Sequence, residues 1–163
     1  MTEKSGQSQA PQHFSCRLSC RAEEIAALAD AVAEWAHGMG VSARTINYVN
    51  LMLDELVANI AMHAYQGRQD GAIEVRADYD GAAVCVTLRD QGPPFDPMLQ
   101  APADTALGMD EREPGGLGIH FVRQMANQLS YRRDGGVNEV IFCRNDGSQS
   151  TVAAQAVGEE GHG

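Results

Sequence analysis

The chain has 163 residues, of which 44% are hydrophobic, and this is enough for the core of one domain. Its formal net charge of -10 argues against a surface that binds nucleic-acid phosphates, because that interaction needs a basic face. No apolar run approaches the roughly 20 residues that cross a bilayer, and the first residues contain no apolar signal core. We therefore expect a cytoplasmic protein that binds neither nucleic acid nor membrane.

Both ends of the chain are poor in large apolar residues. Residues 1–12 are polar, and residues 146–163 are rich in small and polar types. We expect two flexible tails, which leaves residues 13–145 as the folded domain.

The first half of the domain predicts one strand and two helices. Residues 13–20 read as a short strand, and residues 21–40 repeat apolar side chains at helical spacing until Gly38 and Gly40 end the pattern. The apolar stripe of this helix consists of Ile25, Leu28, Ala29, Val32 and Trp35. Residues 42–65 predict a longer second helix, with a serine placed as its N-cap.

The next segments change to the period of strands. Residues 72–80 and 82–90 predict a hairpin that turns at Asp80 and Gly81. The stretch from about residue 98 to residue 116 is rich in Pro, Ala, Asp and Gly, and it is too long for an ordinary connection. We expect it to form a mobile lid.

The last segments of the domain complete the predicted architecture. Residues 117–130 predict a third helix, and residues 131–144 predict a final hairpin with a Gly-Gly turn. Three helices with a mainly antiparallel sheet indicate an α+β domain, a two-layer α/β sandwich in which the helices cover one face of the sheet.

The four cysteines fit a reducing compartment. Cys85 and Cys143 lie in apolar, strand-like runs, where we expect buried thiols that behave as small hydrophobes. Cys16 and Cys20 lie near His13, but neither a CxxC pair nor a second pair of ligands accompanies them. A zinc site is therefore not expected.

Three polar residues, Glu55, Asn59 and His63, follow one line of the second helix at intervals of four. On a helical wheel, the apolar stripe beside this line consists of Val49, Leu53, Leu56 and Ile60. A carboxylate on the flank of that stripe is desolvated enough to accept a proton, and an amide oxygen there suits Mg²⁺. The alternative is a solvated Glu that shares a hydrogen bond with the Asn four residues later.

Two further stretches place glycines beside polar groups. Asp90 ends a strand, and Gly92 follows it, so a ligand could approach the backbone closely at Gly92. The Asp90 carboxylate could then accept a hydrogen bond from an amine such as that of adenine. The alternative is that Asp90 only leads a turn. A second group of glycines lies where a loop enters a helix, and it consists of Gly115, Gly116 and Gly118. The free amides at the start of such a helix attract phosphate. The alternative is a flexible loop with a tight helix start. Neither group is a P-loop or a dinucleotide-binding fingerprint.

The order of these motifs resembles that of the Bergerat-fold (GHKL) ATPases, which include histidine kinases, the ATPase subunit of DNA gyrase, the heat-shock chaperone ATPases and the anti-sigma-factor serine kinases. The segment "DELVANIAMHAY" is similar to the N box of that superfamily, "RDQGPPFDP" to its first glycine box and "PGGLGIHFV" to its second. The resemblance spans residues 14–144. It is nearest to the stand-alone anti-sigma-factor serine kinases, whose N box ends in a similar His-Ala/Gly-Tyr segment.

The resemblance implies roles for the residues of the first two boxes. Glu55 would receive the proton of the attacking hydroxyl, and Asn59 would coordinate Mg²⁺ at the phosphates of ATP. Asp90 would read the adenine amine, with Gly92 lying against the base. His63 would border the phosphates or order the helix, although a packed histidine without such a role is an alternative.

The resemblance also assigns the second glycine box and the lid. Gly115, Gly116 and Gly118 would form the hinge between the lid and the phosphate-binding helix. Arg112 is the only basic residue of the lid, and it is therefore the candidate to contact the γ-phosphate. One departure from the family pattern is Pro94, which replaces the second glycine of the first box and weakens the case for lid flexibility at that end.

The resemblance thus implies an ATP-dependent serine/threonine-protein kinase with ATP and Mg²⁺ as cofactors. Its expected partners are a STAS-type anti-anti-sigma protein, which it phosphorylates, and a sigma factor, which it sequesters reversibly; a homodimer is also expected. The alternative is a non-catalytic ATP/ADP-binding module that switches between partners. The presence of Glu55 favours catalysis, since binding alone needs no base.

Overall fold

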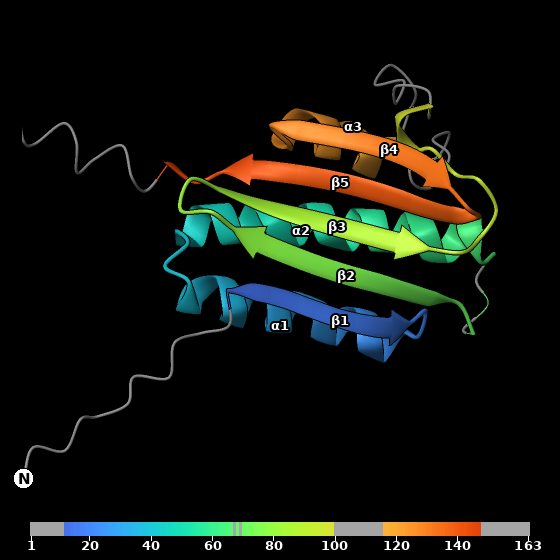
Figure 1. The fold of residues 1–163 in the computed structure, drawn as a ribbon, viewed down its shortest axis with the longest axis horizontal. Helices are drawn as coiled ribbons and strands as arrows, with labels where there is room; N and C mark the ends of the chain where they lie inside the picture. The colour runs from blue at the N-terminus through green and yellow to red at the C-terminus, as the bar shows by residue number, and fades with distance from the viewer. Residues whose placement is uncertain (1–11, 67, 69, 100–115, 148–163) are drawn as a thin grey trace, which may run out of the picture.

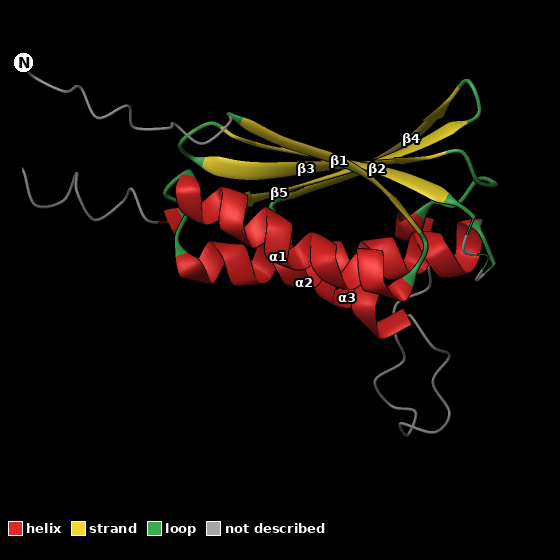
Figure 2. Ribbon diagram, turned by 90° about the horizontal axis from the view of Figure 1, so that it is seen from below, coloured by secondary structure: helices red, strands yellow, loops and turns green. Residues whose placement is uncertain are grey.

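The computed structural model describes residues 12–66, 68, 70–99 and 116–147. In these residues, five strands form one antiparallel sheet in the order β1-β2-β3-β5-β4, and three α-helices cover one of its faces (Figures 1 and 2). The elements in chain order are β1 (His13–Ser19), α1 (Ala22–Gly38), α2 (Ala43–Asn59), the π-helix η1 (Ile60–Ala64), β2 (Ala72–Tyr79), β3 (Ala83–Asp90), the short 3-10 helix η2 (Pro97–Leu99), α3 (Gly116–Met125), β4 (Gln128–Asp134) and β5 (Val137–Asn145). The predicted two-layer α+β sandwich is confirmed.

The sheet has a covered face and an open face, because successive side chains of a strand point to opposite sides. Along β2, Ile73, Val75 and Ala77 are buried on the covered face, whereas Glu74 and Arg76 between them are exposed on the open face. The helices meet the covered face with their predicted stripes. The buried stripe of α2 and η1 consists of Val49, Leu53, Leu56 and Ile60.

A polar cluster fixes the beginning of α2. The hydroxyl of Ser42 accepts a hydrogen bond from the Thr45 amide at 3.3 Å, as expected of an N-cap. The carboxylate of Asp146 accepts hydrogen bonds from the hydroxyls of Ser42 (2.6 Å), Thr45 (3.1 Å) and Tyr79 (3.1 Å). Asp146 is buried, so the folded part of the chain includes the residue with which we expected the C-terminal tail to begin.

The third helix is shorter than its predicted range of 117–130. It ends at Met125, where the Arg144 guanidinium donates a hydrogen bond to the Met125 carbonyl at 2.6 Å. Residues 128–130 instead begin β4, which pairs with β5 and packs Leu129 and Tyr131 against the core. The prediction was wrong here because the pairing of β4 with β5 outweighs a local helical pattern.

The prediction of two buried free thiols was also wrong. Cys85 and Cys143 lie directly opposite each other on β3 and β5, with Cα atoms 4.1 Å apart, and they form a disulfide. They belong to the open face of the sheet, since the neighbouring Val84 and Phe142 point into the core. Cys16 and Cys20 are free. None of the helices in the described ranges has both the length and the apolar character required to cross a bilayer.

Candidate active site

The second helix does not continue as a regular α-helix to residue 65. From Ile60 to Ala64 it becomes the π-helix η1, which closes with a hydrogen bond from the Tyr65 amide to the Ile60 carbonyl at 3.3 Å. A π turn takes one more residue than an α turn, so it rotates the side chains that follow relative to the rest of the helix. Sequence periodicity did not predict this change, because a single π turn of five residues is too short to alter the periodic pattern of the helix.

After this turn, Ala64 and Tyr65 pack against the segment that follows β3. The Tyr65 hydroxyl accepts a hydrogen bond from the Gln91 amide (3.2 Å) and donates one to the Ala72 carbonyl (2.9 Å). Burial in this contact raises the pKa of the Tyr65 hydroxyl. A Cβ at Gly92 would lie 2.6 Å from the Cβ of Ala64, so only glycine permits this approach. The end of the N box therefore holds the first glycine box in place.

His63 contributes a third contact between these two boxes. Its ring stacks on the ring of Phe95, with centroids 4.7 Å apart and planes 6° from parallel. His63 is otherwise exposed, and its stacking on Phe95 is compatible with the alternative of a packed histidine. The stacking partner is a feature that the sequence did not reveal.

Glu55 and Gly118 meet where α2 packs beside α3. Glu55 is half-buried, and its carboxylate lies so close to Gly118 that a Cβ at that position would overlap it. The structure thus brings the acid of the N box to the second glycine box, 63 positions later in the chain. The hydrogen bond between Asn59 and Glu55 that we considered as an alternative uses the backbone carbonyl of Glu55, so it leaves the carboxylate available.

Asn59 is buried on α2, one turn after Glu55. Its side-chain amide donates a hydrogen bond to the backbone carbonyl of Glu55 at 2.8 Å, which orients the side chain. Within the described ranges, its Oδ1 atom has no hydrogen-bond partner, and a neutral oxygen of this kind fits Mg²⁺. The same ranges contain no group of three His, Cys, Asp or Glu side chains suited to a metal.

Asp90 is buried at the end of β3. Its Oδ1 accepts hydrogen bonds from the amide of Gly92 (2.8 Å) and the side chain of Asn138 (2.9 Å). The first of these bonds makes the turn that we considered as an alternative role. In the part of the chain that is described, Oδ2 accepts no hydrogen bond, so the same carboxylate can also accept one from an amine.

Asn138 on β5 is a residue of this site that the motifs did not identify. It is 2% exposed, and besides Asp90 its amide donates to the carbonyls of Gly92 (3.2 Å) and Pro93 (3.0 Å). Its oxygen accepts from the hydroxyl of Tyr131 (2.7 Å) and from the guanidinium of an arginine of β4, Arg133 (2.8 Å). The sequence did contain an indication of this role. Asn138 lies two and four positions before the apolar Val140 and Phe142, so alternation along the strand places it on the same, buried face.

The remaining predicted residues belong to the second glycine box and the lid. Gly116 is the first residue of α3, as expected for a glycine-rich helix start. Arg112 and Gly115 lie outside the described residues, as does the predicted lid apart from its first residues.

These contacts join the N box to both glycine boxes. Residues 18–144 match the family of the histidine kinase-like ATPase domain. The chain belongs to this family. The resemblance to Bergerat-fold ATPases inferred from the motifs is thereby confirmed.

Relatives of this histidine kinase-like ATPase domain include named kinases and anti-sigma factors. The chain is 28% identical over 109 residues to the serine/threonine-protein kinase BtrW of Bordetella bronchiseptica, covering 67% of this chain and 77% of that protein. It is 24% identical over 123 residues to an anti-sigma F factor of Clostridium beijerinckii, covering 76% of this chain and 86% of that protein.

Solved structures show the same fold. The chain resembles the structure of the RsbU and RsbW domains of Rv1364c from Mycobacterium tuberculosis, with a TM-score of 0.55 and 14% identity over 83% of this chain. This chain spans 33% of that longer protein. It also resembles the SiaB–SiaC complex from Pseudomonas aeruginosa, with a TM-score of 0.55 and 13% identity, covering 81% of this chain and 89% of that one.

Proposed function

We propose that this chain is an ATP-dependent serine/threonine-protein kinase of the anti-sigma-factor type. The observation that most directly supports this function is the contact between the Glu55 carboxylate and Gly118. It places a candidate base beside the N-terminal turn of α3, whose free amides suit phosphate groups. A protein that only binds a nucleotide has no need of a carboxylate at this position.

In the proposed reaction, each residue has a separate task. Asp90 accepts a hydrogen bond from the exocyclic amine of adenine through Oδ2, and Asn59 offers Oδ1 as a magnesium ligand. Glu55 accepts the proton of the acceptor hydroxyl as its oxygen bonds to the γ-phosphorus and the bond to ADP breaks. A bound magnesium ion neutralises charge on the phosphates. Gly92 keeps the backbone open to the base, and Arg112 and Gly115 belong to the proposed lid.

The names of the relatives support a role in partner switching. We propose that the phosphate acceptor is a serine of a STAS-type anti-anti-sigma protein. The unphosphorylated form of that partner competes with a sigma factor for binding to this chain. The kinase acts as a homodimer in the cytoplasm. The second candidate function is a nucleotide-dependent binding module without phosphoryl transfer. The two candidates differ in whether Glu55 acts on a hydroxyl.

The deciding experiment compares Glu55→Gln with Asn59→Ala. Glu55→Gln keeps the size of the side chain, so the affinity for ATP, measured by calorimetry, should stay within about threefold of wild type. Transfer of radiolabelled phosphate to a STAS-type protein encoded nearby should fall by about 10²-fold or more, because the base is lost. Asn59→Ala should weaken both, because it removes the proposed metal ligand. The matched control is Asp54→Asn, which neutralises the exposed acid one position earlier.

Two outcomes would count against the proposal in different ways. Transfer by Glu55→Gln at the wild-type rate would show that Glu55 is not the base. If wild-type protein binds ATP but transfers no phosphate to any STAS-type protein encoded beside it, the binding-module function replaces the kinase.

A further inference from the structure

The disulfide between Cys85 and Cys143 joins two neighbouring strands, β3 and β5, which lie side by side in Figure 1. Its two halves differ in their exposure. Cys143 is 6% exposed, whereas Cys85 is half-buried and lines a cavity of about 550 Å³ together with Asp78, its neighbour on β2. A reagent that enters this cavity therefore meets the disulfide from the side of Cys85.

Residues 143–146, which we call the C-terminal anchor, hold the end of α3. Asn127 lies just after α3 and makes two bonds to the anchor. Its amide donates a hydrogen bond to the first carbonyl of the anchor (2.8 Å), and its Oδ1 accepts one from the Asn145 amide (2.8 Å). The Arg144 guanidinium also donates a hydrogen bond to the carbonyl of Met125, the last residue of α3. The end of α3 is thus fixed by three bonds to the anchor.

The C-terminal anchor also holds the start of α2. The Arg144 guanidinium lies over the ring of Tyr48, 4.3 Å from its centroid. The carboxylate of Asp146 accepts hydrogen bonds from the hydroxyls of Ser42 and Thr45, at the N-cap and in the first turn of α2. Since α2 and α3 both carry residues of the candidate active site, the anchor supports that site from its far end.

The disulfide lies where the pairing of β5 in the sheet weakens. The pairing of β4 with β5 ends where Gln128 lies opposite Cys143, so in the described part of the chain Arg144 and Asn145 pair in the sheet with β3. The ends of strands open more readily than their centres. The disulfide therefore fixes the C-terminal anchor to β3 at the position where it would otherwise begin to separate.

We propose that the Cys85–Cys143 disulfide is a redox site whose oxidised form holds the C-terminal anchor and supports nucleotide binding, and whose reduction frees the anchor. This inference rests on the proposed cytoplasmic location. Cytoplasmic thiols are kept reduced, and the disulfides that form there are usually transient and act in catalysis or redox sensing. The reductant is by chemical class a dithiol, and the oxidant is the corresponding disulfide.

The exchange transfers two electrons and two protons from the dithiol to the protein. A thiolate of the dithiol attacks the sulfur of Cys85, the S–S bond breaks, and the sulfur of Cys143 leaves with the electron pair and takes up a proton. The second thiolate of the reagent then attacks its own sulfur in the mixed disulfide. The reagent leaves as a disulfide, and the released Cys85 thiolate takes up the second proton.

Reduction should weaken the fold and the nucleotide site together. The bond closes a loop between residues 58 positions apart, and the chain entropy of such a loop corresponds to a factor of roughly 10³ in the folding equilibrium constant. The loss acts first at the C-terminal anchor, because the strand end beside it opens most readily. A site that is formed in a smaller fraction of the molecules binds its ligand more weakly by that fraction.

The first test is whether a dithiol reduces the folded chain. In about 1 mM dithiothreitol without denaturant, Cys85 and Cys143 should both become open to alkylation within about an hour, as read by mass spectrometry. Glutathione disulfide should restore the bond after the reductant is removed. Reduction only after unfolding in urea, or failure to restore the bond, would overturn the redox site.

Hydrogen exchange on the full chain locates the effect of reduction. Reduced wild type should exchange the amides of Asn127, Asn145 and Asp146 at least about fivefold faster than oxidised wild type, because these amides belong to the C-terminal anchor or bond it. The Gly92 amide, which is held by Asp90 beyond the other end of β3, should not change. Equal exchange at the anchor in both states would overturn its control by the disulfide.

Calorimetry with ATP measures the effect on the nucleotide site. Reduced wild type and Cys85→Ala should both bind ATP at least about threefold more weakly than oxidised wild type, and dithiothreitol should not alter Cys85→Ala further. The matched control is Cys16→Ala, which removes a free thiol and should keep the full redox response. If Cys85→Ala does not fold, as judged by circular dichroism, the two redox states of wild type still decide.

The outcomes separate this inference from the proposed kinase function. Equal ATP affinity in the two redox states would overturn the link between the C-terminal anchor and the nucleotide site. A redox response that is lost in Cys16→Ala would overturn the assignment to Cys85 and Cys143. Absence of ATP binding in both states would count against the proposed kinase, and hydrogen exchange at the anchor would still decide whether the disulfide holds it.

Discussion

Replacing Asn138 with alanine should loosen the adenine end of the site. Asn138 joins the turn after β3 to β4 through five hydrogen bonds, and the substitution removes all of them. A net contribution of about 1 kcal/mol each sets an upper limit near 5 kcal/mol. Water can enter the space left at the end of the sheet, so we expect a loss of about 2–4 kcal/mol in the free energy of unfolding.

The same substitution should weaken adenine binding without touching the nucleotide. Asp90 would keep only the Gly92 amide as a donor to Oδ1, so its carboxylate would no longer be held in one orientation. We expect ATP affinity to fall by about tenfold, or about 1.4 kcal/mol, with less discrimination against GTP. Urea denaturation and calorimetry with both nucleotides measure the two effects.

A matched control is Asn127→Ala, which removes an exposed asparagine whose oxygen accepts one hydrogen bond from the Asn145 amide. It should cost less than about 1 kcal/mol and leave ATP affinity unchanged. If Asn138→Ala keeps wild-type stability and wild-type selectivity for ATP over GTP, the network around Asp90 does not position the carboxylate.

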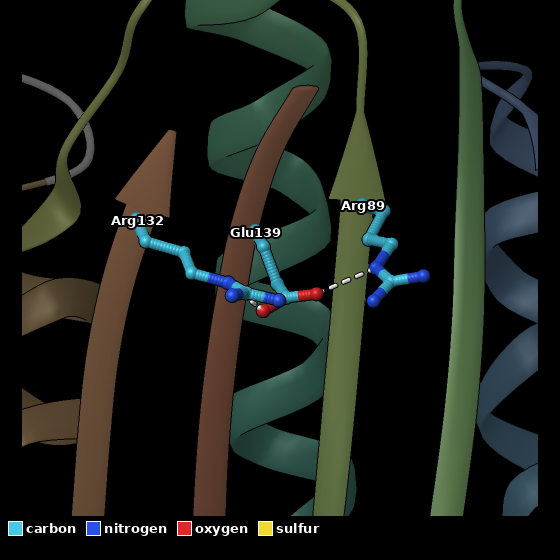
Figure 3. A network of polar contacts seen from close by, with 3 residues as sticks. All are labelled: Arg89, Arg132 and Glu139. Carbon is cyan, nitrogen blue, oxygen red and sulfur yellow. Dashed lines mark hydrogen bonds and ion pairs between the residues drawn. The ribbon is translucent and has the colours of Figure 1, made fainter. Parts of the chain in front are cut away.

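Two further variants test other contacts. Gly118→Ala places a methyl group where the Glu55 carboxylate lies, so phosphoryl transfer should fall by about 10²-fold while ATP affinity, measured by calorimetry, changes little. Alanine favours a helix over glycine by about 1 kcal/mol, so unfolding of α3 would not explain the loss, and unchanged transfer would separate Glu55 from the reaction. Glu139→Gln tests the ion pairs that Glu139 forms with Arg132 and Arg89 (Figure 3). Arg132 and then Arg89 hold the pKa of Glu139 below its ordinary value of 4.5. The carboxylate therefore stabilises the fold fully above about pH 4.5, and this contribution is lost as the pH falls through the lower pKa of the folded state. The difference in urea-unfolding free energy between wild type and Glu139→Gln should be largest near pH 7 and shrink below about pH 4; a difference that does not change with pH would contradict the assignment.

Local pattern alone determined most of the elements. Helical spacing identified the buried stripe of α2, and Ser42 marked its start, because apolar periodicity and capping act over a few residues. The turn at Asp80 and Gly81 located the β2–β3 hairpin for the same reason. The order of three short motifs was sufficient to place the chain in its family.

Only the tertiary structure decided which residues meet across long separations. The register of β3 with β5 placed Cys85 against Cys143, Arg89 against Glu139 and Asp90 beside Asn138. Strand register depends on which face each strand buries and on partners tens of residues away, and neither is encoded in a short window of sequence. The contact of Glu55 with Gly118 and the change from α- to π-helix arise in the same way, because packing between distant elements selects them over local alternatives that the sequence permits equally.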